Sequence, residues 1–170
     1  MKAVIVLAVR GAPPLDFPEE ELAEFGALRS RLAHAGGAGP APAERRFHEL
    51  EHKIRAWPRS PRNDPSHADS QELAVQLRRA SGRKVILGFD EFCAPSLDEA
   101  LDQAAGQGAE KILVVTPMMT RGGEHGEREI PAAVERARRR HPAMSFIYAW
   151  PFPSSDVAEF LTSQINKAIG

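Results

Sequence analysis

The chain has a single cysteine, Cys93, among its 170 residues, so it can form no internal disulfide. A chain without disulfides fits a reducing compartment, and we expect a cytoplasmic protein. Cys93 lies between the apolar residues Phe92 and Ala94. We interpret it as a small buried hydrophobic side chain rather than a nucleophile, because the sequence identifies no base to activate it.

The sequence also lacks an excess of either charge. Its 22 lysines and arginines are balanced by 23 acidic residues, which leaves a formal net charge of -1. No overall basic field therefore attracts the protein to nucleic acid or to a membrane surface, and we expect neither as a partner. The basic run Arg136–Arg140 is interpreted as a helix end, where cations are favoured by the helix dipole.

Long apolar runs are missing as well. The longest, Ala3–Val9 and Ile112–Val115, have the length of strands and are far too short to span a bilayer. Arg10 interrupts the first run, and two prolines follow where a signal peptide would need small residues. We therefore predict that this run is the first strand and not a signal peptide.

What the chain does contain is an alternation of apolar strands and amphipathic helices. The predicted strands are Lys2–Val9, Lys84–Phe89, Lys111–Thr116 and Ser145–Trp150. The predicted helices are Pro18–Ala35, Ala43–Ala56, Ser66–Ala80, Ser96–Gln107, Ile130–Arg140 and Ser155–Ile169, with a capping box formed by Ser96 and Glu99. The alternation predicts an α/β fold, in which residues 1–170 form a single domain around an open four-stranded parallel sheet with helices on both faces.

The first connection departs from this pattern, because three helices instead of one separate the first two strands. We interpret about Leu15–Pro65 as a helical insertion. Its two helices have one apolar face each, and neither can bury that face alone. We therefore predict that they pair and pack on the domain or on a partner subunit, with Arg59 and Arg62 near the mouth of a cleft.

Ligands of parallel sheets bind at the carboxyl ends of the strands. The segments that follow the strands are Arg10–Pro14, Asp90–Cys93, Pro117–His125 and Pro151–Pro153. In the third of these, a Gly-Gly turn presents His125, whose imidazole can bind a divalent metal or take up a proton near neutral pH. The other interpretation is a loop histidine without a special role. Met118 and Met119 either line a flat apolar ligand or fill the core.

The insertion contains a second motif, His48-Glu49-Leu-Glu-His52, which matches the H-E-x-x-H zinc-peptidase signature. Glu72 lies downstream, where a third ligand is sought. The flanking apolar residues Phe47, Leu50 and Ile54 indicate an ordinary amphipathic helix instead, and the insertion has no sheet to form a peptidase cleft. A zinc peptidase is therefore only a remote alternative.

Three segments resemble the CbiX-type sirohydrochlorin chelatases, small relatives of ferrochelatase, in content, order and spacing. They are Glu91–Ala100, Lys111–Met119 and Gly122–Pro131. The resemblance covers the first strand and everything from about Ser66, and leaves out the insertion. It implies a chelatase-like fold and the insertion of cobalt, iron or nickel, as a substrate metal, into sirohydrochlorin or a related tetrapyrrole during cobalamin or siroheme biosynthesis. It implies no organic cofactor, and we list a homodimer as an open alternative.

The resemblance also implies the site residues. His125 is the expected metal ligand and base, and Glu91 the assisting acidic residue and ligand. The second family histidine usually follows the first strand, where this chain has Arg10, and a guanidinium can neither bind a metal nor accept a proton. We expect Arg10 to emerge at the cleft, where it either pairs with Glu91 or Glu124 or binds a substrate carboxylate.

Two further arginines, Arg121 and Arg128, are expected to contact substrate carboxylates, with solvated surface arginines as the alternative. The main functional alternative to a chelatase is a non-catalytic relative that binds a tetrapyrrole or a metal and is disabled by Arg10.

Overall fold

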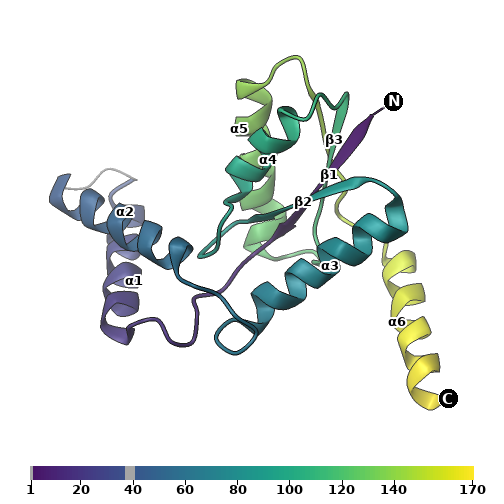
Figure 1. The fold of residues 1–170 in the computed structure, drawn as a ribbon, viewed down its shortest axis with the longest axis horizontal. Coiled ribbons are helices and arrows are strands. Elements are labelled where there is room, and N and C mark those ends of the chain that lie inside the picture. Colours follow the sequence, from purple (N-terminus) through teal and green to yellow (C-terminus); the bar gives the residue numbers. More distant parts are fainter. Residues whose placement is uncertain (1, 37–40) are drawn as a thin grey trace.

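The computed structural model describes residues 2–36 and 41–170. The strands and helices, most of which are labelled in Figure 1, follow one another in the order β1 (Ala3–Val9), α1 (Glu19–His34), α2 (Ala41–Ala56), α3 (Pro65–Ser81), β2 (Lys84–Phe89), α4 (Leu97–Ala105), β3 (Lys111–Val115), the π-helical turn His125–Glu129, α5 (Ile130–Arg140), β4 (Ser145–Tyr148) and α6 (Ser154–Ile169).

The strands form one parallel sheet in the order β2-β1-β3-β4. The predicted α/β fold with four parallel strands is thus confirmed. The last strand ends two residues earlier than predicted. Its pairing stops after the bond from the Ala149 N–H to the Val114 carbonyl (2.9 Å), and Pro151 has no N–H to continue the ladder.

The two faces of β1 are buried by different helices. Val4, Val6 and Ala8 pack in an apolar layer with α4 and α5. Ile5, Leu7 and Val9 face the other side, in a layer that includes Ala74 of α3. Helices therefore cover both faces, as predicted. Successive residues of β1 enter opposite apolar layers, as expected for a central strand of a parallel sheet.

The insertion helices α1 and α2 pair with each other, as their apolar faces predicted. Their shared core contains Phe17, Phe25, Leu50 and Ile54, all buried. The Phe25 ring stacks on Phe47 at 5.0 Å and meets Phe92 edge-on at 6.0 Å. Phe92 follows β2, so this small core is joined to the end of the sheet.

Arg59 does not lie at the mouth of a cleft, and that prediction was wrong. Its side chain is buried, forms an ion pair with Asp64, and donates to the carbonyls of Ala12 (2.7 Å), Ile54 (2.9 Å) and Phe92 (2.6 Å). A guanidinium has five donors, so it can be buried wherever several carbonyls converge. Arg59 thus joins the insertion to the loops after β1 and β2, whereas Arg62 is exposed.

Cys93 is buried, as predicted, and its burial raises the pKa of the thiol. Within the described residues, no helix has the length and apolar character needed to cross a bilayer.

Candidate metal centre

The ends of β1 and β2 remain paired beyond the strands themselves. The Asp90 N–H donates to the Val9 carbonyl (2.9 Å), and the Glu91 N–H to the Arg10 carbonyl (2.8 Å). Gly11 has a φ of +82°, and a Cβ there would lie 2.1 Å from the Glu91 carbonyl oxygen. The close approach of the two loops therefore requires glycine, and it sets Arg10 beside Glu91 at the ligand-binding edge.

His125 lies on a π-helical turn that continues into α5, and not on an open loop as predicted. Trp150 holds this turn in place. Its indole N–H donates to the Met118 carbonyl (2.9 Å), and its ring lies so close to Gly126 that a Cβ there would be 2.9 Å away. The helical turn brings His125 and Glu129, four residues apart, to the same side. Such π-turns are frequent at functional sites.

Three side chains converge at this edge. His125 Nδ1 contacts the carboxylates of both Asp90 and Glu129. One ligand atom from each of the three residues lies within 4.8 Å of the others, and all three side chains are partly buried. In the described part of the chain, this is the one group of three or more histidine, cysteine or acidic residues with such geometry. One imidazole nitrogen with two carboxylates suits divalent first-row transition metals.

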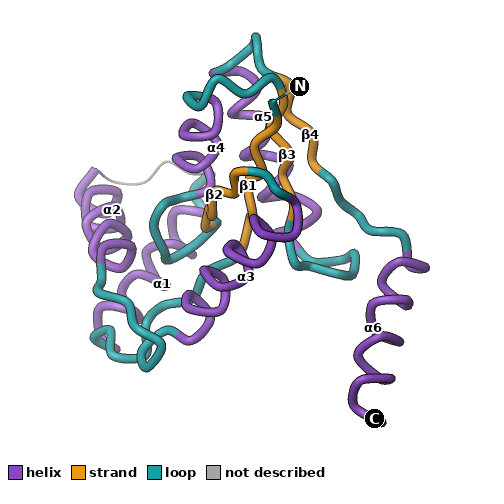
Figure 2. The backbone as a smooth tube through the Cα atoms, turned by 45° about the vertical axis from the view of Figure 1, so that its right-hand side comes forward, coloured by secondary structure: helices purple, strands orange, loops and turns teal. Residues whose placement is uncertain are grey.

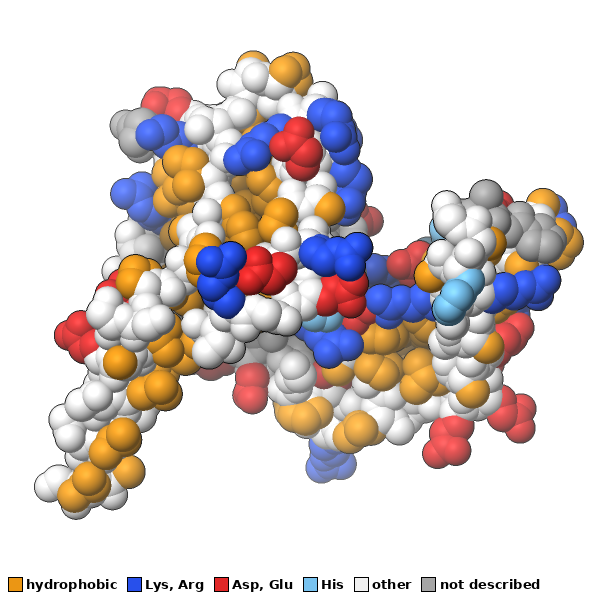
Figure 3. Space-filling view, turned by 180° about the vertical axis from the view of Figure 1, so that it is seen from behind, with side chains coloured by type: hydrophobic (Ala, Val, Ile, Leu, Met, Phe, Trp, Pro, Cys, Tyr) orange, Lys and Arg blue, Asp and Glu red, His pale blue; other side chains and the backbone are white. Residues whose placement is uncertain are grey.

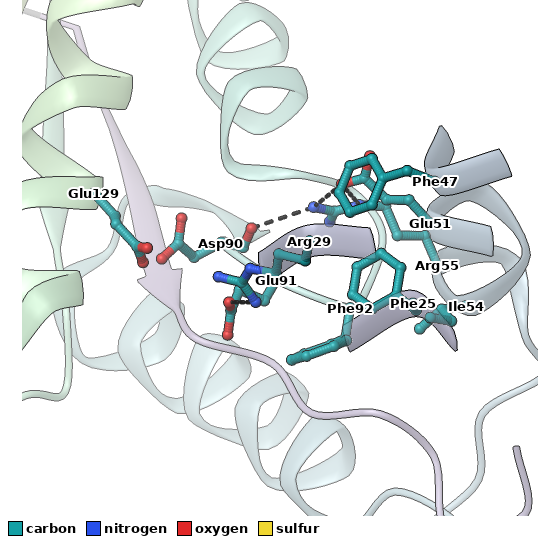
Figure 4. Close-up of a pocket in the computed structure, with 10 residues that line it drawn as sticks. All are labelled: Phe25, Arg29, Phe47, Glu51, Ile54, Arg55, Asp90, Glu91, Phe92 and Glu129. Atoms are coloured by element: carbon teal, nitrogen blue, oxygen red, sulfur yellow. Dashed lines mark hydrogen bonds and ion pairs between the residues drawn. The ribbon is translucent and has the colours of Figure 1, made fainter. Parts of the chain in front are cut away.

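Glu129 has a strongly perturbed acidity. Its hydrogen bond with Asp90, together with burial and the negative charge of Asp90, raises the pKa of Glu129 to about 7. The two carboxyl groups face each other in Figure 4. Without a metal, Glu129 keeps a proton up to near neutral pH, and a cation bound between the two carboxyl groups would displace that proton.

Glu91 lies beside this group but is held by two cations. Its side chain is 9% exposed, and one oxygen is 3.1 Å from Arg10 Nε, whereas the other forms an ion pair with Arg29 of α1. His125 Nε2 is 3.9 Å from the Glu91 carboxylate. His125 and Glu91 therefore face the same site, but Asp90 and Glu129 are the carboxylates that contact the imidazole.

Sequence reasoning did not select Asp90, Glu129 or Arg29. The sequence marks Asp90 only as the first residue after β2. Glu129 carries a usable signal, since it lies four residues after His125 on a helical segment. No sequence pattern points to Arg29, because its position beside Glu91 depends on how the insertion packs on the domain.

The three arginines predicted to bind substrate are all exposed. The Arg10 side chain is 62% exposed and emerges at the site, paired with Glu91. Arg121 pairs with Glu127 at 3.1 Å, and Arg128 with Glu124 at 3.5 Å. Arg128 also lines a shallow depression that includes Asp90 and Glu129, so it lies close enough to meet a ligand of the site.

A small cavity of about 150 Å³ separates the insertion from the strand ends (Figure 4). Its apolar wall comes mainly from Phe25, Phe47 and Phe92, and its polar wall includes Arg29, Asp90, Glu91 and Glu129. This space is far smaller than typical cofactor pockets. A macrocycle would therefore have to bind over the open side of the site, against exposed arginines.

The H-E-x-x-H motif lies on α2, as predicted, but has no metal-site geometry. The His48 side chain is 71% exposed and pairs with Glu51 at 3.6 Å. His52 and Glu72 are exposed, and none of them belongs to a metal-binding group within the described residues. The zinc-peptidase alternative is therefore not favoured.

The comparisons with known proteins agree on one family. The family model described as CbiX matches residues 61–168. The sirohydrochlorin cobaltochelatase of Sulfurisphaera tokodaii is 30% identical over 103 residues, which cover 58% of this chain and 82% of that protein. The sirohydrochlorin cobaltochelatase of Priestia megaterium is 28% identical over 81 residues, which cover 47% of this chain but only 26% of the relative.

Among solved structures, the cobalamin biosynthesis CbiX protein of Marinobacter aquaeolei is 17% identical, with all of both chains covered and a TM-score of 0.49.

Proposed function

This chain belongs to the CbiX family, and from that premise we propose that it is a tetrapyrrole metal chelatase. Its reaction is the insertion of a divalent metal, cobalt or iron, into sirohydrochlorin or a related tetrapyrrole, in cobalamin or siroheme biosynthesis. The proposal is supported by relatives that are named sirohydrochlorin cobaltochelatases.

The observation that carries the proposal is the convergence of Asp90, His125 and Glu129 at the carboxyl end of the sheet. Insertion brings in one dication, and two pyrrole N–H protons must leave. His125 and one or both carboxylates hold the incoming metal. Glu129, with a pKa of about 7, has the acidity required of a proton acceptor near neutral pH. As the metal passes to the macrocycle, Glu129 and the freed imidazole of His125 each take up one of the two protons, so His125 acts first as ligand and then as base, assisted by two carboxylates rather than by Glu91 alone.

In this proposal the arginines bind the carboxylates of the macrocycle, and Glu91 changes partners when the macrocycle binds. Sirohydrochlorin carries many carboxylates, and guanidinium groups bind carboxylates with paired hydrogen bonds. Arg10 and Arg29 hold Glu91 in the free protein. A substrate carboxylate can replace Glu91 at Arg10, which releases the Glu91 carboxylate toward His125. Arg121 and Arg128 contact further carboxylates from the rim.

Arg10 also supports a second candidate, a non-catalytic relative that binds a metal or a tetrapyrrole. The ion pair between Arg10 and Glu91 occupies the place where the resemblance leads us to expect a second histidine. A site with one imidazole can bind a metal and still transfer it poorly.

An insertion assay separates the two candidates. Protein, cobalt and sirohydrochlorin are mixed, and the absorbance change of the macrocycle is followed against the uncatalysed rate. We expect acceleration by the wild type and its loss in His125→Ala. The matched control is His141→Ala, which removes a histidine that pairs with Asp102 at 2.7 Å outside the site. Tight binding of cobalt and sirohydrochlorin without acceleration would support the non-catalytic candidate instead.

A further inference from the structure

The loop that follows β2, Asp90–Cys93 (the ligand loop), carries one of the three residues of the candidate metal centre. Its backbone is strained at Phe92, which has a φ of +57°, a left-handed conformation that bulky residues rarely adopt. The Cys93 N–H donates to the Glu91 carbonyl (2.6 Å), which closes a tight turn around Phe92. A strained conformation of this kind persists only where the surrounding structure holds it.

The insertion supplies the side chains that hold the ligand loop. Arg55 of α2 donates from Nη1 to the Cys93 carbonyl (2.6 Å) and from Nη2 to the Asp90 carbonyl (3.2 Å). One guanidinium thus bonds the first and the last residue of the loop. Arg59 donates to the carbonyl between them, that of Phe92 (2.6 Å). Figure 4 shows Arg55 reaching Asp90 from the side of the loop opposite to Glu129.

Arg55 is in turn oriented by its own helix. Glu51, one turn earlier on α2, accepts a hydrogen bond from Arg55 Nη2 at 3.2 Å, and the Arg55 side chain is 20% exposed. Ile54, the residue before it, is buried in the core that α2 shares with α1. A guanidinium presents its donors in a rigid planar fork. Arg55 can therefore fix the positions of two carbonyls relative to each other, which a single ammonium group cannot do.

The insertion meets the rest of the molecule at this loop. Figures 1 and 2 both show α1 and α2 side by side, to one side of the sheet. Figure 3 shows basic side chains next to acidic ones where the insertion, at the right of that view, meets the rest of the molecule. Arg29 of α1 adds an ion pair with Glu91 to the contacts made by Arg55 and Arg59. The ligand loop is thus held through both its backbone and its side chains.

From these contacts we infer that Arg55 is a positioning residue of the metal centre. By bonding the carbonyls of Asp90 and Cys93, it holds the ligand loop in the conformation that directs the Asp90 carboxylate at His125. The inference rests on the metal site of the proposed function and gives the insertion a part in metal binding. Residues that orient a metal ligand without touching the metal typically change metal affinity by about 10–100-fold when they are replaced.

Arg46 provides a matched control on the same helix. It donates two hydrogen bonds to Glu24 of α1, at 2.9 Å and 2.7 Å, and so joins the two insertion helices. Its bonds do not involve the ligand loop. Arg46→Ala therefore loosens the insertion itself, whereas Arg55→Ala releases the loop, and a comparison of the two separates positioning from general stability.

The first test is the cobalt affinity of the metal-free full chain, measured by calorimetry, with folding checked by circular dichroism. We expect Arg55→Ala to bind cobalt about tenfold more weakly than the wild type. Arg55→Lys, which keeps the charge but bonds one carbonyl at a time, should show a smaller loss, and Arg46→Ala none. Wild-type affinity in either folded Arg55 variant, or an equal loss in Arg46→Ala, would overturn the inference.

The second test needs no metal. Amide hydrogen exchange, followed by mass spectrometry, should be faster in the peptide containing residues 90–93 of Arg55→Ala than in the same peptide of the wild type or of Arg46→Ala. Equal exchange in all three proteins would contradict a positioning role. A wild type that binds no cobalt would overturn both the proposed function and this inference. A wild type that binds cobalt no better than its folded Arg55 variants would overturn this inference alone.

Discussion

Arg10 Nε lies 3.1 Å from Glu91 Oε2, at the place where the resemblance to sirohydrochlorin chelatases leads us to expect a metal-binding histidine. Arg29 from the insertion pairs with the other oxygen of the same carboxylate. Two guanidinium groups thus neutralise the acidic residue closest to the second imidazole nitrogen of His125. The three residues whose ligand atoms lie close enough together to bind a metal are instead His125, Asp90 and Glu129.

Replacement of Arg10 by histidine should strengthen metal binding. Arg10→His removes one cation beside Glu91 and supplies an imidazole, and we expect cobalt affinity to rise by about tenfold, or about 1.4 kcal/mol, in calorimetry. Arg83→His, an exposed substitution just before β2, is the control. If Arg10 mainly anchors substrate, the variant will bind sirohydrochlorin more weakly without gaining cobalt affinity. No change in either measurement would place Arg10 outside the working site.

Replacement of Arg59 should weaken the whole fold. Arg59→Leu leaves the Asp64 carboxylate buried without its cation and removes the donors of three carbonyls. We expect the free energy of unfolding to fall by about 3–5 kcal/mol in urea denaturation. Arg62→Leu, three residues away and exposed, should change it by less than about 0.5 kcal/mol. Equal effects of the two variants would contradict the bracing role of Arg59.

Glu129 should make the metal-free protein less stable as pH rises. Its pKa is raised from 4.5 to about 7 in the folded protein, so the folded state binds this proton more tightly than the unfolded state. The contribution of this proton to the stability of the fold is complete at pH values below 4.5, the pKa of Glu129 in the unfolded protein. It is lost as pH rises through about 7, the pKa in the folded protein. Glu129→Gln should therefore flatten the decline in melting temperature across this window. Glu135→Gln, which removes an exposed partner of Arg138, should leave the decline unchanged.

The same proton should compete with the metal. Cobalt displaces it from Glu129, so cobalt affinity should increase as pH rises through about 7, opposite in direction to the stability of the metal-free protein. A cobalt affinity that falls with rising pH in this range would contradict the assignment of Glu129 as a ligand.

Much of the fold could be read from local patterns. The apolar run at Ala3–Val9 can be buried on both sides only in a central strand, and the structure places it there. The run at Lys111–Val115 forms the neighbouring strand, in which Ile112 and Val114 are buried and the alternate residues only partly buried. Ser96 and Glu99 form the predicted capping box, because its two hydrogen bonds depend only on residues three apart.

What the sequence could not provide depends on tertiary packing. The π-turn at His125 forms where Trp150, distant in the chain, packs against Gly126. Arg29 reaches Glu91 only because the insertion packs on Phe92, and Arg59 is buried only because three separate carbonyls converge on it. None of these contacts has a periodicity or a spacing that the linear sequence records.

The most direct test of the metal site is the position of cobalt in crystals of the protein, located by anomalous diffraction at the cobalt edge. The account predicts one strong peak bonded to His125 and to Asp90 or Glu129, absent from His125→Ala crystals. Because the His125 side chain is only 15% exposed and contacts the carboxylates of Asp90 and Glu129, the melting temperature of His125→Ala is measured first to check that the variant is folded. A peak at His48 and His52 with none at His125 would contradict the account.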